Sequence, residues 1–345
     1  MTDLLSASFE RLLDAHCTPA QVRAIEGGQS SAALWNALSE SGFLDALVPE
    51  TLGGAGLTLA DVYPLIETCG RYAVPLPCAQ TMLARALLSA AATALPDGPV
   101  TIGVAASANP GAGVTCYGVP YAARAKWALV ALPGGTVLLP VASGERTSSS
   151  PRASAATLYW PGEIAAQVRF IDAPPVDFLP LQACLLAAEM AGALLRIFGM
   201  TLQYANERTQ FGRSIGKFQA IQHQISVMAE NTALARTAAR LGCSSETHLP
   251  HADAAAIAKS LTSEAAVSIT AIAHAVHGAI GITEEYDLQL YTRRLHEWRR
   301  IAGSESYWNE RIGAALIAGT TPVLDFVRRD LPPNHLETEP GERRP

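Results

Sequence analysis

Apolar residues in the first part of the chain recur at the three- and four-residue spacing of amphipathic helices. The positions that define two such faces are Leu4, Phe9, Leu12 and Leu13, and then Leu34, Leu38, Phe43 and Leu44. Gly42 interrupts the second face, and Pro49 with the glycines that follow marks a turn between helices. The pattern predicts an N-terminal helical domain over residues 1–97.

The pattern changes between residues 98 and 176, where short apolar runs are separated by turn residues. Residues 127–139 read as two strands joined by a Pro-Gly-Gly turn, and residues 167–171 indicate a further strand. The Ser- and Gly-rich segment 143–154 is predicted to be an exposed loop. Together these features predict a small central β domain over residues 98–176.

Helical spacing returns from Leu179 onward. One stripe carries Phe218, Ile221, Ile225, Met228 and Thr232, and an alanine-rich run over 251–280 has few helix breakers. Residues 177–330 are therefore expected to form a bundle of long antiparallel helices, and residues 331–345, rich in Pro, Glu and Arg, a disordered tail. The expected fold class is α+β multidomain.

Composition narrows the functional classes. The 345 residues and 49% hydrophobic content allow a substantial core in more than one domain. The formal charge of −6 is spread without a basic cluster, which argues against a nucleic-acid partner. The six cysteines lack Cys-x-x-Cys spacing, so we expect buried thiols rather than disulfides or a metal site.

Two features predict a cytoplasmic protein without membrane association. Asp3, Glu10, Arg11 and Asp14 interrupt any apolar core that a signal peptide would need. No later apolar run is expected to reach membrane-spanning length without interruption.

Four patches between residues 30 and 318 carry a resemblance to the acyl-CoA dehydrogenase family. They are Val48-Pro-Glu through Gly56-Leu57, Arg208-Thr-Gln-Phe-Gly212 followed by Phe218-Gln219, Val276-His-Gly-Ala-Ile-Gly-Ile-Thr-Glu-Glu-Tyr286, and residues 291–304. The resemblance implies an FAD cofactor, and it implies that Arg208 crosses a subunit interface to the FAD pyrophosphate. A planar, permanently charged guanidinium suits that task. The alternative is an arginine that only ends a helix at a hairpin turn.

The same resemblance assigns further FAD contacts. The residues it places at the cofactor are Arg208, Gln210, Phe211, Gln219, His277, Gly278, Gly281, Ser304 and Ser306. Two positions of this stretch depart from the family pattern, because Ala275 replaces a glutamine and Ala279 replaces a glycine. These changes remove a polar contact and narrow the space for the cofactor.

The resemblance also shows that both usual positions of the catalytic base lack a carboxylate. The family glutamate of the 291–304 segment falls on Ala302, and the alternative position on the first bundle helix holds Gln182. Neither an alanine nor an amide can accept the α-proton of an acyl-CoA thioester. Glu189 and Glu305 are the remaining candidates, although Glu189 is expected to bond between helices and Glu305 to follow a Ser304 cap.

The central β domain departs from the family in a similar way. Asn109-Pro-Gly-Ala-Gly113 resembles a flavin-contacting loop, but Ala108 and Val114 replace its flanking hydroxyl residues. Counting back from Trp127, the tryptophan that covers the flavin in relatives becomes Gly118, and a nearby threonine becomes Pro120.

These departures predict an accessory subunit that completes an FAD site across an interface, with the base on another chain. The resemblance implies an acyl-CoA substrate, assembly as a homodimer or as a heterotetramer with a second acyl-CoA dehydrogenase-like subunit, and electron-transfer flavoprotein as acceptor. Two alternatives stay open: a homomeric dehydrogenase with a base such as Glu189, and a scaffold that binds neither FAD nor CoA. The basic patch of Arg293, Arg294, Arg299 and Arg300 is expected either to be a solvated helix face or to meet CoA phosphates or a partner.

Overall fold

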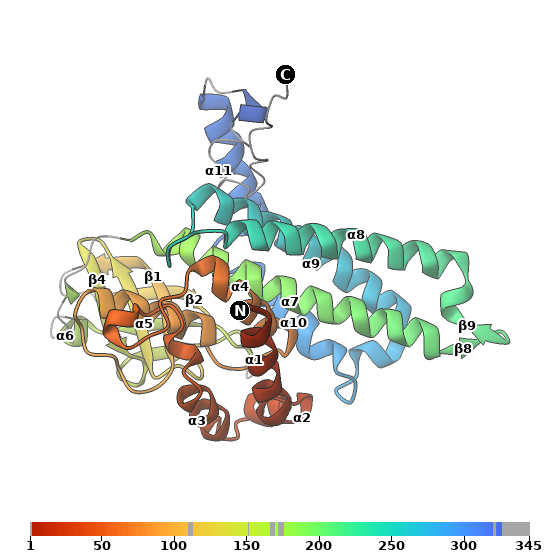
Figure 1. The fold of residues 1–345 in the computed structure, drawn as a ribbon, viewed down its shortest axis with the longest axis horizontal. Coiled ribbons are helices and arrows are strands. Elements are labelled where there is room, and N and C mark those ends of the chain that lie inside the picture. The colour runs from red at the N-terminus through yellow and green to blue at the C-terminus, as the bar shows by residue number, and fades with distance from the viewer. Residues whose placement is uncertain are drawn as a thin grey trace, which may run out of the picture.

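The computed structural model describes residues 2–109, 113–150, 152–165, 170–171, 176–319 and 322–325. Helices occupy both ends of the chain and a sheet occupies the middle (Figure 1). The tail predicted over 331–345 lies outside the described residues.

Five helices form the N-terminal part. They are α1 (Thr2–His16), α2 (Pro19–Glu26), α3 (Ala32–Glu40), α4 (Leu59–Arg71) and α5 (Cys78–Ala90), with the 3₁₀ turns η1 (Phe43–Asp45) and η2 (Glu50–Leu52) between α3 and α4. Capping boxes at Thr18 and Thr58 begin α2 and α4. Phe9 and Leu13 are buried as predicted, but Leu4 is 77% exposed.

The central segment forms one seven-stranded sheet in the order β5-β6-β2-β1-β3-β4-β7. Its elements are β1 (Val100–Asn109), β2 (Gly113–Val119), β3 (Trp127–Leu132), β4 (Gly135–Pro140), η3 (Val141–Ser143), β5 (Glu145–Thr147), β6 (Ala156–Trp160), α6 (Gly162–Ala165) and β7 (Phe170–Ile171). The predicted hairpin is confirmed as β3 and β4, and β1 joins β3 in parallel.

One prediction for this sheet needs correction, and another falls partly outside the described residues. The Ser- and Gly-rich segment is not simply a loop, because β5 pairs with β6 at the sheet edge and Ser154 is buried. Serine and glycine content indicated exposure but could not show that backbone pairing would extend into this segment. The predicted strand over 167–171 is described only at Phe170 and Ile171.

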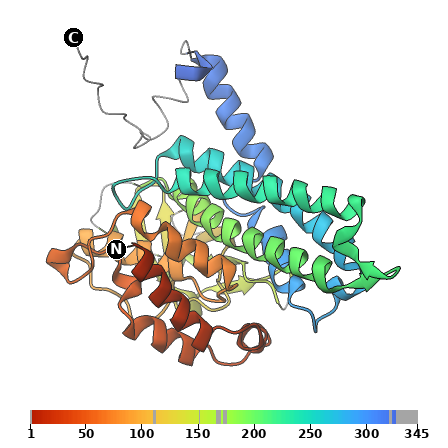
Figure 2. The same cartoon turned by 45° about the vertical axis from the view of Figure 1, so that its right-hand side comes forward.

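The C-terminal part is a bundle built on three long helices. They are α7 (Phe178–Glu207), α8 (Gln219–Gly242) and α9 (Ala252–His277), followed by η5 (Gly278–Ile282), α10 (Leu288–Trp298) and α11 (Glu305–Ala318). The short hairpin β8 (Thr209–Gln210) and β9 (Arg213–Ser214), then η4 (Ile215–Lys217), connects α7 to α8. Figure 1 shows this hairpin at the end of the molecule farthest from the sheet, and Figure 2 shows α11 standing away from the body.

Helices α4 and α7 cross at a contact that admits only glycine. A methyl group at Gly70 would lie 1.8 Å from the backbone oxygen of Glu189, and one at Gly192 would lie 1.8 Å from that of Glu67. Because both obstacles are backbone atoms, neither can rotate away. The crossing fixes the N-terminal helices against the bundle.

The expectation that no apolar run reaches membrane-spanning length was wrong. Helix α7 and the segment Ala252–Ile282 are both long and apolar enough to span a membrane by length and composition. The most apolar stretch of α7 is 89% buried inside the protein, as in the core helix of a bundle, whereas that of Ala252–Ile282 is 44% buried.

Candidate functional site

The hairpin after α7 projects into solvent. Arg208 ends the helix: its N–H donates to the Tyr204 carbonyl at 2.8 Å, and its own carbonyl accepts from Ile215 N–H at 2.9 Å. Phe211 at the tip has φ 52° and is 90% exposed. The guanidinium of Arg208 has no ion pair or hydrogen bond to any residue that the structure describes. An exposed, unpaired arginine is free to bind an anion from outside the chain.

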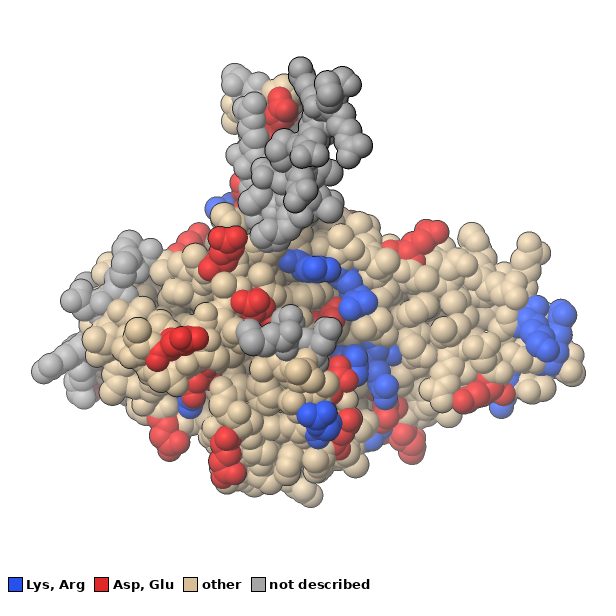
Figure 3. Space-filling model, in the orientation of Figure 1, with Lys and Arg blue, Asp and Glu red and all other residues tan. Residues whose placement is uncertain are grey.

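Aromatic contacts hold the hairpin against the start of α8, and a polar contact holds it against the last turn of α7. The Arg213 guanidinium stacks 4.2 Å from the ring centroid of Phe218, and Phe211 meets the same ring edge to face. Ser214 Oγ donates to the Ala205 carbonyl at 2.8 Å. Gln219 begins α8 and is exposed. In Figure 3, Lys and Arg side chains gather at the end of the molecule where Figure 1 places β8 and β9.

His277 links a second predicted segment to the same end of the bundle. Its ring stacks on Tyr204 with centroids 4.5 Å apart, and Tyr204 Oη donates to the His277 carbonyl at 3.3 Å. Nδ1 lies 2.7 Å from the Ala273 carbonyl, whereas buried Nε2 has no partner among the described residues. Burial lowers the pKa of His277 despite the Ala273 bond, and nearby His274 lowers it further. A neutral ring suits this aromatic stack.

The turn after α9 requires glycine at two positions. Gly278 has φ 64° and ψ −144°, and at Gly281 a Cβ would lie 3.0 Å from the His277 Cβ. Between them Ala279 and Ile280 are exposed. The structure therefore places the predicted residues of the hairpin and of this turn at one end of the bundle, joined through Tyr204 and His277.

The loop between α10 and α11 is held entirely from inside the chain. Ala302 has φ 54°, and its carbonyl accepts from Trp308 Nε1 at 2.9 Å. Lys259 Nζ donates to the carbonyls of Arg299 and Gly303 at 2.9 Å each, and its third proton goes to Ser263 Oγ. Lys259 is fully buried, and burial lowers its pKa to about 7. The sequence offered no signal for Lys259, since an alanine-rich helix favours an exposed lysine.

The residues after Ala302 take the structural roles expected of them. Ser304 caps α11, with Tyr307 N–H donating to its Oγ at 3.4 Å, and Ser306 is exposed. Arg299 Nε donates to Glu305 at 3.0 Å. Burial opposes ionisation of Glu305, but the Arg299 bond, a backbone N–H bond and the charges of Arg299 and Lys259 together outweigh it, and the pKa falls below its usual range. A carboxylate held this way is a poor proton acceptor.

Gln182 is committed to the sheet. Its side-chain Nε2 donates to the Ile102 carbonyl at 2.9 Å, and only 4% of the residue is exposed. This bond joins α7 to β1 and requires an N–H donor at position 182. A carboxylate there would face the carbonyl acceptor-to-acceptor.

Glu189 lies in the core rather than at a cleft. It is fully buried, and Gln80 Nε2 approaches its Oε2 at 3.5 Å, as expected of a carboxyl that bonds between helices. Burial raises its pKa to about 8, although bonds from Tyr121 and Gln80 act in the opposite direction. A proton acceptor must reach its substrate, and Glu189 has no surface to offer one.

The cleft between the sheet and α10 is narrow. A Cβ at Gly118 would lie 3.8 Å from Ile301 Cγ1. Both residues line a cavity of about 260 Å³ with hydroxyl groups of Thr147 and Thr157. Val114 is buried in the sheet core, whereas positions 110–112 of the predicted flavin loop lie outside the described residues.

The predicted basic patch on α10 divides into paired and unpaired arginines. Arg293 and Arg294 pair with Glu26, and Arg294 is buried; Arg299 pairs with Glu305. A solvated helix face was thus the wrong expectation for Arg294, because its partner lies 268 residues away in the sequence. Arg300 is exposed and has no partner in the described part of the chain.

Comparison with known proteins places these features in a family context. The model of the acyl-CoA dehydrogenase N-terminal domain matches residues 2–94, and that of the acyl-CoA dehydrogenase C-terminal domain matches residues 177–317. The chain is 32% identical over 301 residues to acyl-CoA dehydrogenase IpdE2 of Mycobacterium tuberculosis, covering 85% of this chain and 90% of that protein.

Solved structures show the same fold. The ChsE4-ChsE5 complex from Mycobacterium tuberculosis matches with a TM-score of 0.79 and 20% identity over 93% of this chain and 98% of that chain. An acyl-CoA dehydrogenase from Geobacillus kaustophilus matches with a TM-score of 0.72 and 18% identity over 91% and 97%.

Proposed function

Because this chain belongs to the acyl-CoA dehydrogenase family, whose members are oxidoreductases acting on CH–CH groups, we propose that it is a subunit that completes an FAD site across an interface. The substrate is an acyl-CoA thioester. Another chain supplies the base that removes the α-proton. The unpaired guanidinium of Arg208 on an exposed hairpin carries this proposal.

The outward-facing residues fit the pyrophosphate of FAD. Arg208 offers a two-pronged donor, and Gln210 and Phe211 stand beside it on the hairpin. Gly278 in the turn after α9 is exposed and has open space where a side chain would stand, so a ligand can approach its backbone. FAD, when bound, accepts the hydride that leaves the β-carbon of the thioester. The chain's own part is to bind and orient the cofactor from the partner's side.

The inward-facing residues do not fit a complete site of this chain's own. Ala302 presents a methyl group where a base is required, and Gln182 spends its amide on the Ile102 carbonyl. Gly118 and Ile301 line a cavity of about 260 Å³. This volume is smaller than that of the usual ligand pocket, about 300–1,000 Å³. Proton abstraction therefore falls to a partner.

The surface supports a partner of the same fold. Leu234 on α8, Val267 on α9 and Ile282 in η5 are between 43% and 73% exposed, and the apolar Ala252–Ile282 segment is only 44% buried. Exposed apolar surface of this kind marks association sites. We propose a second acyl-CoA dehydrogenase-like subunit, in a homodimer or heterotetramer, and electron-transfer flavoprotein as acceptor.

The test compares the chain alone with the chain co-purified with a second acyl-CoA dehydrogenase-like subunit encoded beside it. Acyl-CoA oxidation is followed with an artificial electron acceptor. The isolated chain should be slower by about 10²–10⁴-fold or more, because it lacks a positioned base. Equal turnover by the isolated chain would refute the proposal.

A further inference from the structure

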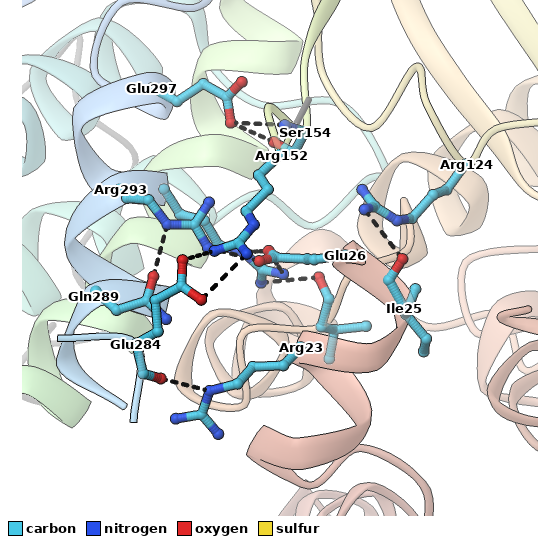
Figure 4. A network of polar contacts seen from close by, with 12 residues as sticks. Arg23, Ile25, Glu26, Arg124, Arg152, Ser154, Glu284, Gln289, Arg293 and Glu297 are labelled. Carbon is cyan, nitrogen blue, oxygen red and sulfur yellow. Dashed lines mark hydrogen bonds and ion pairs between the residues drawn. The ribbon is translucent and has the colours of Figure 1, made fainter. Parts of the chain in front are cut away.

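A pocket lies between α2, α10 and residues of the β5–β6 connection, away from the hairpin. Its volume is about 260 Å³, and four arginines line it against only two carboxylates, Glu26 and Glu297. Figure 4 shows Arg293 bonded to Glu26 and Arg152 directed toward Glu284 nearby. Arginines in excess of carboxylates make the pocket a candidate site for an anion.

Glu26 is neutralised within the protein. Its two oxygens accept from Arg293 Nη2 at 2.7 Å and from Arg294 Nη2 at 2.9 Å. The Glu26 and Arg294 side chains are 4% and 3% exposed, so this carboxylate is not available to another cation. Burial opposes ionisation of Glu26, but the two arginines more than offset it and lower its pKa.

Glu297 is committed to the backbone of the β5–β6 connection. Ser154 N–H and Oγ donate to one of its oxygens at 3.1 and 2.6 Å, and Ala155 N–H donates to the other at 2.9 Å (Figure 4). These bonds fix the wall of the pocket and use the second carboxylate. Neither acidic residue of the pocket is therefore free to pair with Arg300.

Two arginines remain available to a ligand. Arg300 is exposed, and its guanidinium makes no hydrogen bond or ion pair with the residues described. Arg152 pairs with Glu284, but the two side chains are 49% and 70% exposed, and an exposed pair of this kind contributes little. Ser149 and Ser150 add two hydroxyl groups at the same rim.

His296, also in the lining, reports the potential of the pocket. Burial is the largest cause that lowers the pKa of His296. The positive charge of Arg299 lowers this pKa further, followed by His274 and then Arg300. An anion in the pocket would favour the protonated ring and raise this pKa.

We propose that this pocket binds the phosphate group of a phosphorylated small molecule. Arg300 and Arg152 supply forked donors of the geometry that phosphate oxygens accept, and Ser149 and Ser150 supply hydroxyl donors. At about 260 Å³ the pocket admits a phosphate and the group next to it rather than a whole dinucleotide. The site does not depend on the FAD contacts of the hairpin.

The experiment is an NMR titration of His296 in the full-length chain, assigned by comparison with His296→Gln. Inorganic phosphate and adenosine 3′,5′-bisphosphate are the probes, and sodium chloride at equal ionic strength controls for screening. Both probes should raise the His296 pKa by about 0.5 or more in a saturable manner. Arg300→Gln should weaken binding by about tenfold. The matched control Arg240→Gln removes an exposed arginine of α8 and should bind like wild type.

The relative affinities of the two probes distinguish two kinds of ligand. Equal affinity for the two probes supports a site for phosphate itself, and tighter binding of the bisphosphate supports a nucleotide-bearing ligand. An identical response to sodium chloride, no saturation at millimolar phosphate, or equal weakening in Arg240→Gln would each overturn the proposal. Circular dichroism of both variants excludes loss of fold as the cause.

Discussion

The two halves of helix α7 serve opposite purposes. Near its start, Gln182 bonds to the Ile102 carbonyl and Glu189 is sealed in the core, so both polar groups act inside the chain. At its end, Arg208 stands in solvent with no partner among the described residues. The first half of this helix thus supports the fold, and the residue that follows its last turn is a cation left open to solvent. The contrast teaches that one helix can carry both polar groups committed to the fold and a cation left available to a ligand.

The largest effect is expected at Arg208, the exposed residue that follows α7. In the assembled complex, Arg208→Ala should weaken FAD binding by about 2–5 kcal/mol, because it leaves a buried phosphate unpaired. Arg208→Lys should restore little of this, since an ammonium lacks the guanidinium fork. Flavin-to-protein ratio measures the effect, and circular dichroism checks the bundle. Unchanged FAD occupancy in Arg208→Ala would mean that this arginine only ends a helix.

Gln182→Glu tests the first half of α7, whose polar groups bond inside the chain. The new carboxylate would oppose the Ile102 carbonyl in a buried site and should lower the free energy of unfolding by about 1–3 kcal/mol. Gln222→Glu is the matched control, because Gln222 makes the same kind of bond, to the Gly216 carbonyl, on the exposed surface. Urea denaturation of both variants measures the difference. Equal losses would show that burial of the Gln182 bond is not what matters.

Glu189 gives the inward half a pH dependence. Burial raises the pKa of Glu189 from 4.5 to about 8. Between these two pH values the folded state therefore keeps a proton that the unfolded state has released. The wild-type free energy of unfolding should therefore fall as pH rises through this window, by about 1.4 kcal/mol per pH unit at most.

Glu189→Gln cannot ionise and should lack this decline, so its stability relative to wild type should improve from pH 5 to pH 8, a window set by the two pKa values. Thermal or urea unfolding at several pH values measures it. Glu230→Gln, at an exposed position of α8, is the control and should track the wild type. A constant difference for Glu189→Gln across this range would show that Glu189 does not carry the proton.

The smallest effect concerns Ala302, which the family resemblance aligns with the position of a catalytic base. Ala302 has φ 54°, which favours glycine, so Ala302→Gly should raise the free energy of unfolding by about 0.5 kcal/mol after the entropic cost of glycine is counted. Ala233→Gly, at an exposed helical position of α8, should instead lose about 0.5–1 kcal/mol. Denaturant titrations compare the two. A loss in both variants would mean that the Ala302 backbone is not strained.

Short-range pattern was sufficient for the class of fold but not for long-range pairing. The β3–β4 hairpin, the long bundle helices and the Ser304 cap follow from spacing and turn residues that are close in the sequence. The Arg294–Glu26 pair joins residues 268 positions apart. Lys259 likewise finds its acceptors on a distant loop. No local pattern encodes such contacts, so a buried charge reads as an exposed one.

The candidate site divides in the same way. The hairpin and the glycine turn are predicted sites because their residues lie in continuous stretches, and Ala302 and Gln182 are assigned to the base positions by register; these assignments stay predictions. The stack of Tyr204 on His277, which brings the two stretches together, depends on how α7 and α9 pack. The commitment of Gln182 to Ile102 was equally invisible, because it depends on the position of β1.

The glycine contact between α4 and α7 fixes one point of α7, so a small tilt of α7 at this contact would displace the far end of the helix. Gly192 is the pivot, and about 22 Å of helix separates it from the residue before Arg208. Over that length a tilt of about 5° would move the hairpin by about 2 Å, a large fraction of a hydrogen-bond length. A single methyl group added at Gly192 could therefore displace Arg208, although the two residues lie far apart along the helix. In the proposed assembly, the position of the hairpin would thus depend on packing inside the core of one chain.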